Sequence, residues 1–396
     1  MTLPIPNSIA ALAPELTAWR RDFHEHPEIA YEEVRTAKVV ARKLREFGFD
    51  AVEEGVGKTG VVGILHGAGG PATDAAHRIL LRADMDALPM DEMTGLPYAS
   101  KTPGRMHACG HDGHTTMLLG AAKHLAETRN FSGTLVFCFQ PAEEGGAGAQ
   151  AMLDDGMLER HPVRAVFGLH NDPRNAVGRF GTAKGGVMAY ADRFVIRIKS
   201  KGGHAAMPHL ATDPIVAGSA LVQAFQTVIS RRRDPMNPAV ISVTRFAAGS
   251  AYNVIPGEAE LWGTVRTLDA KLAEFIVEEM GRQCRLIGEA YGVEIDAQLG
   301  LDAYPVCYND AEQTDFVVKV LRELVGEENV EADAAAVMGG EDFAFLSQAA
   351  PGCFAFIGNG PSAPLHHPAY DFNDEILPLG VAYWTKLAET ALPKAA

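Results

Sequence analysis

Two apolar periodicities alternate along the first half of the chain. Apolar residues at helical spacing predict helices over residues 8–28, 31–48, 114–129 and 149–158. Short continuous apolar runs predict buried strands over residues 60–67, 77–89, 133–144 and 163–171. Strands that alternate with helices are typical of α/β folds, so we expect a sheet covered by helices.

The pattern changes near Ala189. The expected elements are then a strand over 191–200, a helix over 214–230, strands over 239–248 and 258–268, a helix over 270–292 and a strand over 293–300. This βαββαβ order is that of a ferredoxin-like unit, so we interpret residues 189–304 as an inserted α+β domain.

The remaining chain returns to helix (312–326), strand (354–358) and helix (379–392). This tail is short for an independent domain, so we expect it to rejoin the first one. The predicted division is a first domain of residues 1–188 and 305–396, interrupted by residues 189–304.

Composition and charge restrict the class of protein. The chain has 396 residues, 47% of them hydrophobic and 21% charged, as in folded proteins, and its formal net charge of -15 argues against a nucleic-acid partner. No apolar run is long enough to span a bilayer, and the N-terminal segment carries Glu15 with no basic residue ahead of it. We therefore expect no membrane partner and a cytoplasmic location. Five irregularly spaced cysteines indicate reduced thiols rather than a disulfide framework.

Residues 107–114, HACGHDGH, concentrate groups that bind metals. Cys109 and His111 are two residues apart, and a glycine-containing loop would let both point at one centre. A polar loop that caps the following helix explains the pair equally well.

Further polar groups recur at the ends of predicted strands: Asp84, Asp86, the pair Glu143 and Glu144, and His170. In open α/β sheets the carboxyl ends of strands meet at the binding crevice, so these groups could converge. A solvated glutamate pair is common on surfaces, but here one carboxylate could bind a metal while the other acts as a general base. With Cys109, His111 and one of His366 and His367, the set of thiolate, imidazole and carboxylate suits zinc-like ions.

Nine motifs, in order over nearly the whole chain, carry a family resemblance: RRDFHEHPE, RADMDALP, HACGHDGH, QPAEEGG, GLHN, GGHAAMPH, NVIPGEAELWGTVR, GGEDF and LHHPAYDFND. The sequence resembles the aminoacylase/carboxypeptidase family of dinuclear metallohydrolases, in its hippurate hydrolase and N-acyl-amino-acid amidohydrolase branch. The resemblance implies a zinc-peptidase-like catalytic domain with a mixed sheet, interrupted by a lid or dimerisation domain, in a homodimer or dimer-based oligomer.

The resemblance also assigns the metal site. It implies that two divalent ions are held by Cys109, His111, Glu144, His170 and His366, and that Glu143 is the base. His366 is preferred to His367 because its spacing to Pro368 and Tyr370 matches the family's His-x-Pro-x-aromatic pattern.

This chain departs from the wider family at two points. Asp84-Met85-Asp86 stands where the family has His-x-Asp, and Cys109 replaces the bridging carboxylate. We expect Asp84 and Asp86 to orient histidine ligands. A thiolate bridge favours zinc, with manganese, cobalt or nickel as alternatives.

The inserted domain supplies the remaining residues that the resemblance implies. His204 would reach the active site of a neighbouring subunit and stabilise the oxyanion, and Asn253 and Arg266 would recognise the substrate carboxylate. The sequence thus predicts hydrolysis of the amide of an N-acyl amino acid, such as an N-benzoyl or N-acetyl derivative, to a carboxylic acid and a free amino acid.

Three other functions are weighed against this one. A dipeptidase or carboxypeptidase would use the same dinuclear centre. A metal-binding protein without catalysis would not require Glu143. A serine or cysteine hydrolase would need a nucleophile elbow, and the sequence contains no G-x-S-x-G.

Overall fold

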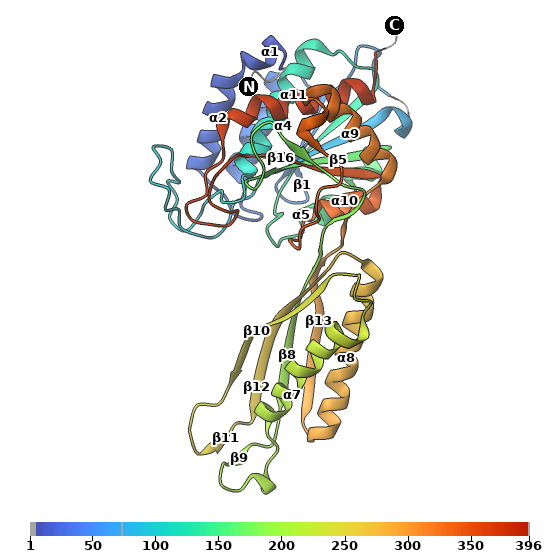
Figure 1. The fold of residues 1–396 in the computed structure, drawn as a ribbon. Coiled ribbons are helices and arrows are strands. Elements are labelled where there is room, and N and C mark those ends of the chain that lie inside the picture. Colours follow the sequence, from blue (N-terminus) through green and yellow to red (C-terminus); the bar gives the residue numbers. More distant parts are fainter. Residues whose placement is uncertain (1–4, 73, 395–396) are drawn as a thin grey trace. The chain divides into compact units, whose positions relative to one another are not determined.

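The computed structural model describes residues 5–72 and 74–394, which form two compact units. Of these described residues, the first unit comprises 5–72, 74–187, 308–335 and 342–394, and the second comprises 188–307 and 336–341 (Figure 1). Each unit has its own sheet and core. Within the described residues, no helix has the length and apolar character needed to cross a membrane.

An eight-stranded mixed sheet forms the centre of the first unit, with strand order β1-β2-β4-β3-β5-β16-β6-β15. The strands are β1 (Ala51–Val56), β2 (Gly60–His66), β3 (Arg78–Asp84), β4 (Thr134–Gln140), β5 (Ala165–Asp172), β6 (Phe180–Gly181), β15 (Val330–Glu331) and β16 (Gly352–Gly358). β3, β4, β5 and β16 run parallel, whereas β1 and β2 are antiparallel to each other and β2 is antiparallel to β4. The expected mixed sheet covered by helices is confirmed.

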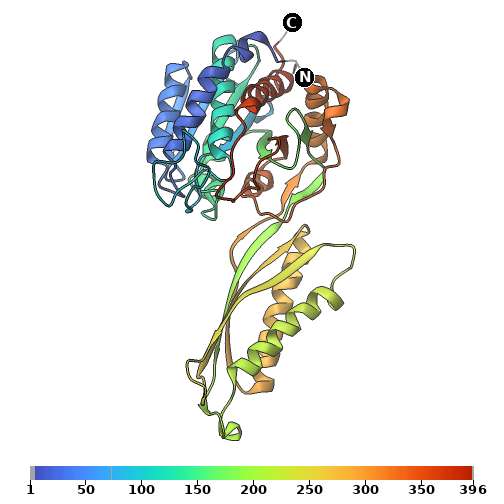
Figure 2. The ribbon, with the colours of Figure 1, turned by 60° about the vertical axis from the view of Figure 1, so that its left-hand side comes forward.

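Helices cover both faces of this sheet (Figures 1 and 2). They are α1 (Asn7–Ala10), α2 (Ala13–Glu25), α3 (Val34–Glu46), α4 (His111–Thr128), α5 (Gly148–Asp154), α6 (Met157–Arg160), α9 (Ala311–Val325), α10 (Phe343–Ala349) and α11 (Leu377–Ala391). α2, α3, α4, α9 and α11 contribute to one large core, in which alternate strand residues such as Leu81 and Phe137 are fully buried. Complete burial of one such side chain stabilises the fold by about 1.5–3 kcal/mol.

The carboxyl ends of three parallel strands lie at one edge of the sheet. β3 pairs with β4 up to Asp84 opposite Gln140, and with β5 on its other side. Residues that end or follow these strands are therefore neighbours in space although they are far apart in sequence. This edge holds the site described below.

The second unit has a four-stranded antiparallel sheet with order β10-β12-β8-β13. Its strands are β8 (Tyr190–Lys199), β10 (Ala239–Ala248), β12 (Glu258–Thr267) and β13 (Glu294–Tyr304), with a separate pair β9 (Gly203–His204) and β11 (Val254–Ile255). Helices α7 (Pro214–Thr227) and α8 (Ala270–Tyr291) lie side by side on one face (Figures 1 and 2). This is the predicted βαββαβ order. Short strands β7 (Gly185–Met188) and β14 (Cys307–Asn309) stand where the chain passes between the units.

One segment groups differently from the expected domain division. Residues 336–341 belong to the second unit, although the sequence analysis places residues 305–396 with the first domain. The Ala189 N–H donates to the Gly339 carbonyl at 2.8 Å, and Met188 forms a β-bridge with Val337. These backbone contacts tie the segment to the beginning of β8, and a sequence pattern does not reveal such pairing.

Some predicted element bounds differ from the structure for local reasons. The helix expected over 8–28 is divided into α1 and α2, because Pro14 lies in the first turn of α2 and proline disfavours a continuous helix. The helix expected over 149–158 is divided at Gly156, which adopts φ +77°. β1 was not predicted, because four of its six residues are charged or small and only one of the six is buried.

Candidate metal centre

The HACGHDGH segment turns sharply into α4. Gly110 precedes the helix with φ +92°, and a Cβ at this position would lie 2.4 Å from the Asn171 side-chain amide. Only glycine fits such a close approach in the left-handed region. The turn places Cys109 just before the helix, and His111 is the first residue of the helix. Both residues are buried.

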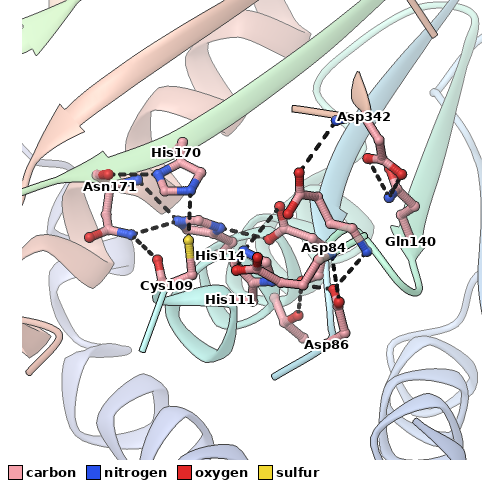
Figure 3. A network of polar contacts seen from close by, with 12 residues as sticks. Asp84, Asp86, Cys109, His111, His114, Gln140, His170, Asn171 and Asp342 are labelled. Carbon is pink, nitrogen blue, oxygen red and sulfur yellow. Dashed lines mark hydrogen bonds and ion pairs between the residues drawn. The ribbon is translucent and has the colours of Figure 1, made fainter. Parts of the chain in front are cut away.

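The five residues expected to bind metals lie together at the carboxyl edge of the sheet (Figure 3 shows Cys109, His111 and His170). The Cys109 Sγ is 3.4 Å from the His170 Nε2. The Glu144 Oε1 is 3.1 Å from the His366 Nε2 and 4.0 Å from the His111 Nε2. Two overlapping groups, Cys109 with His111 and His170 and Cys109 with Glu144 and His366, each bring their ligand atoms within 4.8 Å of one another.

Hydrogen bonds set which ring nitrogen each histidine presents. The His170 Nδ1 is 2.6 Å from the Asn171 carbonyl oxygen, which can only accept, so the Nδ1 carries the proton and the Nε2 lone pair faces Cys109. The His111 Nδ1 lies 3.3 Å from the Asp86 Oδ1 and can donate to it. Both rings are therefore oriented with Nε2 toward the centre, the arrangement found in ligating histidines.

Two buried polar atoms at this centre are incompletely satisfied: His111 Nε2 has no hydrogen-bond partner among the described residues, and Glu144 Oε1 has an ion-pair contact with the half-exposed His366 ring. Such atoms carry a desolvation cost unless something coordinates them. A metal ion would satisfy both, and the sulfur, nitrogen and oxygen donors around them are those of zinc-like sites. The residues present thus fit a dinuclear centre.

The surrounding negative charge affects the pKa of the Cys109 thiol. Burial, together with the carboxylates of Glu144 and Glu143, raises the pKa of Cys109 well above its ordinary value. A thiolate at this position therefore needs a cation to offset the carboxylates. Metal binding and deprotonation of Cys109 are consequently coupled.

His366 comes from a separate loop that is tied to the HACGHDGH segment. Its backbone N–H donates to the Ala108 carbonyl at 2.8 Å, and the residue adopts φ +63°. The ring is half exposed, whereas the other ligands are mostly buried. The ring of His367 instead accepts the Ala369 N–H within its own turn at 3.1 Å.

Asp86 joins His111 to the glutamate pair. Besides its contact with His111, its carboxylate accepts the backbone N–H groups of Glu143 at 3.0 Å and of Glu144 at 2.9 Å. Asp84 lies 3.8 Å from the His111 Nε2. Although burial opposes charge on the ring, Asp84 and Asp86 raise the pKa of His111 to about 10.

Glu143 is the second carboxylate at the centre. It is buried, and its Oε1 accepts the backbone N–H of Asp342 at 3.4 Å. Glu143, Glu144 and His111 bring ligand atoms within 4.8 Å of one another, so Glu143 faces the same space as the proposed ligands.

His114 belongs to this network, but the sequence analysis assigned it no role (Figure 3). Its Nδ1 is 2.7 Å from the Asp84 Oδ1, and its Nε2 accepts the backbone N–H of Asn171 at 3.0 Å. Its ring centroid lies 4.5 Å from that of His170. His114 thus supports the end of β5 next to the ligand His170. Its spacing of three residues from His111 on one helix was the available signal.

The other three expected residues lie in the second unit, and two of them are close together there. His204 lies on β9 opposite Val254 of β11, and the Ala205 N–H donates to the Asn253 carbonyl at 3.0 Å. His204 and Asn253 are both exposed.

Arg266 is distant from that pair within the unit. It lies on β12 opposite Ala191, near one end of the sheet. At the other end, where β8 leads into the β9 segment, Glu258 pairs with Lys199. Eight residues of strand separate Arg266 from Glu258, which corresponds to roughly 26 Å. The Arg266 guanidinium is half-buried and donates to the Val265 carbonyl at 2.9 Å.

Comparison with known proteins agrees with this geometry. Residues 80–390 match the model of peptidase family M20/M25/M40. The chain is 44% identical to a hippurate hydrolase of Campylobacter jejuni, over 96% of this chain and 97% of that protein, and 40% identical to an N-acetylcysteine deacetylase of Bacillus subtilis, over 94% and 96%. It also resembles the crystal structure of a dinuclear metal-binding M20 peptidase of Bacillus subtilis, with a TM-score of 0.82 and 36% identity over 98% and 100% of the two chains. By sequence and by fold, the chain belongs to the peptidase family M20/M25/M40.

Proposed function

We propose that the protein is a metal-dependent amidohydrolase that cleaves the amide bond of N-acyl amino acids to a carboxylic acid and a free amino acid. The observation that carries this proposal is the position of Glu143, a buried carboxylate beside a set of sulfur, nitrogen and oxygen donors that fits two metal ions. The names of two close relatives, hippurate hydrolase and N-acetylcysteine deacetylase, describe hydrolysis of N-acyl amino acids and support this substrate class.

Cys109, His111, Glu144, His170 and His366 would hold the two divalent ions. When bound, the ions supply Lewis acidity that polarises the scissile carbonyl and lowers the pKa of water toward neutrality. The thiolate donor favours zinc, and manganese, cobalt or nickel remain candidates to be tested by reconstitution.

Glu143 acts as the proton carrier. Its carboxylate takes a proton from the attacking water as the C–O bond forms at the acyl carbon. The same carboxyl then gives the proton to the nitrogen of the amino acid as the C–N bond breaks. Its burial excludes bulk water, and the Asp342 N–H orients one of its oxygens.

Substrate recognition draws on the second unit. The Arg266 guanidinium suits the α-carboxylate of the amino acid, because its planar fork matches a carboxylate bidentately. We assign the oxyanion contact to His204 and a contact with the substrate to Asn253. Arg266 is separated by roughly 26 Å along β12 from the end of the sheet near His204 and Asn253. This distance argues that one chain does not supply all three side chains to the same site. We therefore propose a homodimer in which His204 and Asn253 serve the partner's site.

A substrate panel with metal-reconstituted protein tests the proposed function. N-benzoyl and N-acetyl amino acids should be hydrolysed, and a chelator should abolish the activity until a divalent metal is restored. A preference for dipeptides over N-acyl amino acids would favour the dipeptidase or carboxypeptidase alternative. Activity that persists in chelator, after metal analysis shows removal, would exclude the metal mechanism.

Arg266→Ala tests carboxylate recognition separately. This variant should impair substrates with a free α-carboxylate more than their amidated analogues, because the charge-assisted pair is lost only for the former. Equal losses for the two classes would contradict this role.

A further inference from the structure

The segment from Glu28 to Glu33 lies within the first unit and has no role in the chemistry above. Its first residue, Glu28, holds it to two neighbouring parts of the unit. The Glu28 carboxylate accepts the backbone N–H groups of Arg35 at 2.9 Å and Thr36 at 2.8 Å at the start of α3. The Glu28 carbonyl accepts the Ala87 N–H at 2.8 Å, next to Asp86. The segment is therefore a rigid connection between α3 and the strand end that carries Asp86.

Two side chains of this segment reach the turn that carries Glu143 and Glu144. The Tyr31 hydroxyl donates to the Gly146 carbonyl at 2.6 Å, two residues after Glu144. The Glu33 Oε1 accepts the Ala142 N–H at 2.8 Å, one residue before Glu143. The glutamate pair is thus held from both sides by side chains that lie more than 100 residues earlier in the chain.

The turn needs such support, because its backbone is strained. Ala142 adopts φ +54°, a conformation that costs a non-glycine residue free energy. The turn then closes on itself, with the Gly148 N–H donating to the Ala142 carbonyl at 3.1 Å. A strained residue persists only where its surroundings hold it, and Ala142 directly precedes the proposed base.

Glu33 is suited to hold Ala142. Its side chain belongs to a fully buried residue, and its second oxygen accepts the Thr59 hydroxyl at 2.6 Å. A carboxylate with donors on both oxygens has one stable orientation. The position of Ala142, and with it that of Glu143, follows from this orientation.

We propose that Tyr31 and Glu33 are positioning residues that set the orientation of Glu143. This inference rests on the proposed function only in treating Glu143 as the proton carrier. Neither side chain is expected to touch the substrate, because each contacts the backbone of the turn. A small displacement of a reacting group can cost up to roughly 100-fold in rate, so these contacts have a measurable effect on kcat.

The first test compares single variants of the metal-loaded protein. Tyr31→Phe should lower kcat by roughly 3- to 10-fold, because one hydrogen bond to the turn is lost. KM and metal content should stay nearly unchanged. Glu33→Ala should lower kcat by up to roughly 100-fold, and Glu33→Gln, which keeps an acceptor oxygen for the Ala142 N–H, should recover most of that loss. Tyr383→Phe is the matched control, because the Tyr383 hydroxyl has no hydrogen-bond partner in the described part of the chain.

The second test measures backbone hydrogen exchange and does not depend on any substrate. Residues 141–148 should exchange faster in Tyr31→Phe and in Glu33→Ala than in Tyr383→Phe. If wild-type protein hydrolyses no N-acyl amino acid, the proposed function fails while this measurement still decides whether the turn is held. A folded, metal-loaded Tyr31→Phe with wild-type kcat and unchanged exchange over 141–148 would overturn the inference, even if Glu33→Ala did not fold.

Discussion

The carboxylate of Asp86 receives the backbone N–H of Glu143 while it contacts the ring of His111 at 3.3 Å. One side chain therefore sets both the orientation of a proposed metal ligand and the position of the proposed base. His111, at the start of α4, and Glu143, which follows β4, share this one carboxylate.

Asp86→Ala should weaken metal binding by roughly 10- to 100-fold, because a ligating histidine loses the acceptor that fixes its ring. Competition with a chromogenic chelator measures this affinity. Asp74→Ala, which removes an exposed carboxylate in the same unit, is the control. Wild-type affinity and turnover in Asp86→Ala would contradict the connecting role.

Glu143→Ala should abolish turnover and leave the metal content nearly intact, since the proton carrier is lost while the five proposed ligands remain. Elemental analysis of the purified variant decides the point, with Glu144→Ala as the variant expected to lose metal. If Glu143→Ala also lacks metal, the two glutamate roles are assigned wrongly.

Cys109→Ser should lower metal occupancy, because a hydroxyl is a poorer ligand for zinc-like ions than a thiolate. Activity should fall in proportion to occupancy. Cys138→Ser, which alters an equally buried thiol within β4, should leave metal affinity unchanged. Full occupancy and normal turnover in Cys109→Ser would make Cys109 a structural cysteine.

Mixing His204→Ala with Glu143→Ala subunits tests the contribution of the partner subunit. Each variant alone should be inactive or nearly so, with a loss of roughly 10²–10³-fold for the oxyanion donor. About half of randomly re-paired dimers are mixed, and one of the two sites in each is intact, so activity should recover to about a quarter of wild type. No recovery despite demonstrated subunit exchange would exclude a role for His204 in the partner's site.

His24 gives a pH dependence of stability. Burial alone would lower its pKa, but hydrogen bonds to Asp112 at 2.8 Å and to Glu92 raise it from 6.5 to about 9. This contribution is fully present below about pH 6.5 and is lost as the pH rises through about 9, with a magnitude of about 3 kcal/mol.

Denaturant unfolding of wild type and His24→Gln between pH 6 and pH 10 measures this effect as the difference between the two proteins. The difference should shrink as the pH rises, because the wild type loses the charged ring while the variant has none to lose. A difference that is constant over this range would exclude the charged pair.

Local patterns were sufficient to predict much of the fold and the convergence of the proposed ligands. His170 lies near the end of β5 and Glu144 follows β4, and parallel strands bring such residues to one edge of the sheet. The supporting residues could not be predicted in the same way. Tyr31 and Glu33 contact the Glu143–Glu144 turn across more than 100 residues of sequence, and nothing near them in the chain indicates that contact.

His114 shows the same limit on a shorter scale. Its sequence context resembles that of His111, three residues before it on the same helix. The two histidines differ in one contact: the backbone N–H of Asn171, on β5, donates to the His114 Nε2. The tertiary structure thus gives a reason why His111 rather than His114 is the proposed ligand.

The hydrogen bond from Asn171 to His114 also bears on which of the clustered histidine rings is open to a cation. The imidazole rings of His111, His114 and His170 lie close together, with ring centroids 4.5 to 6.1 Å apart. The backbone N–H of Asn171 occupies the Nε2 of His114, so this ring would have to give up that hydrogen bond before it could bind a cation. The position of β5 therefore restricts which of the three rings is open to an ion, and replacing Asn171 with proline, which has no N–H, would remove this backbone contact.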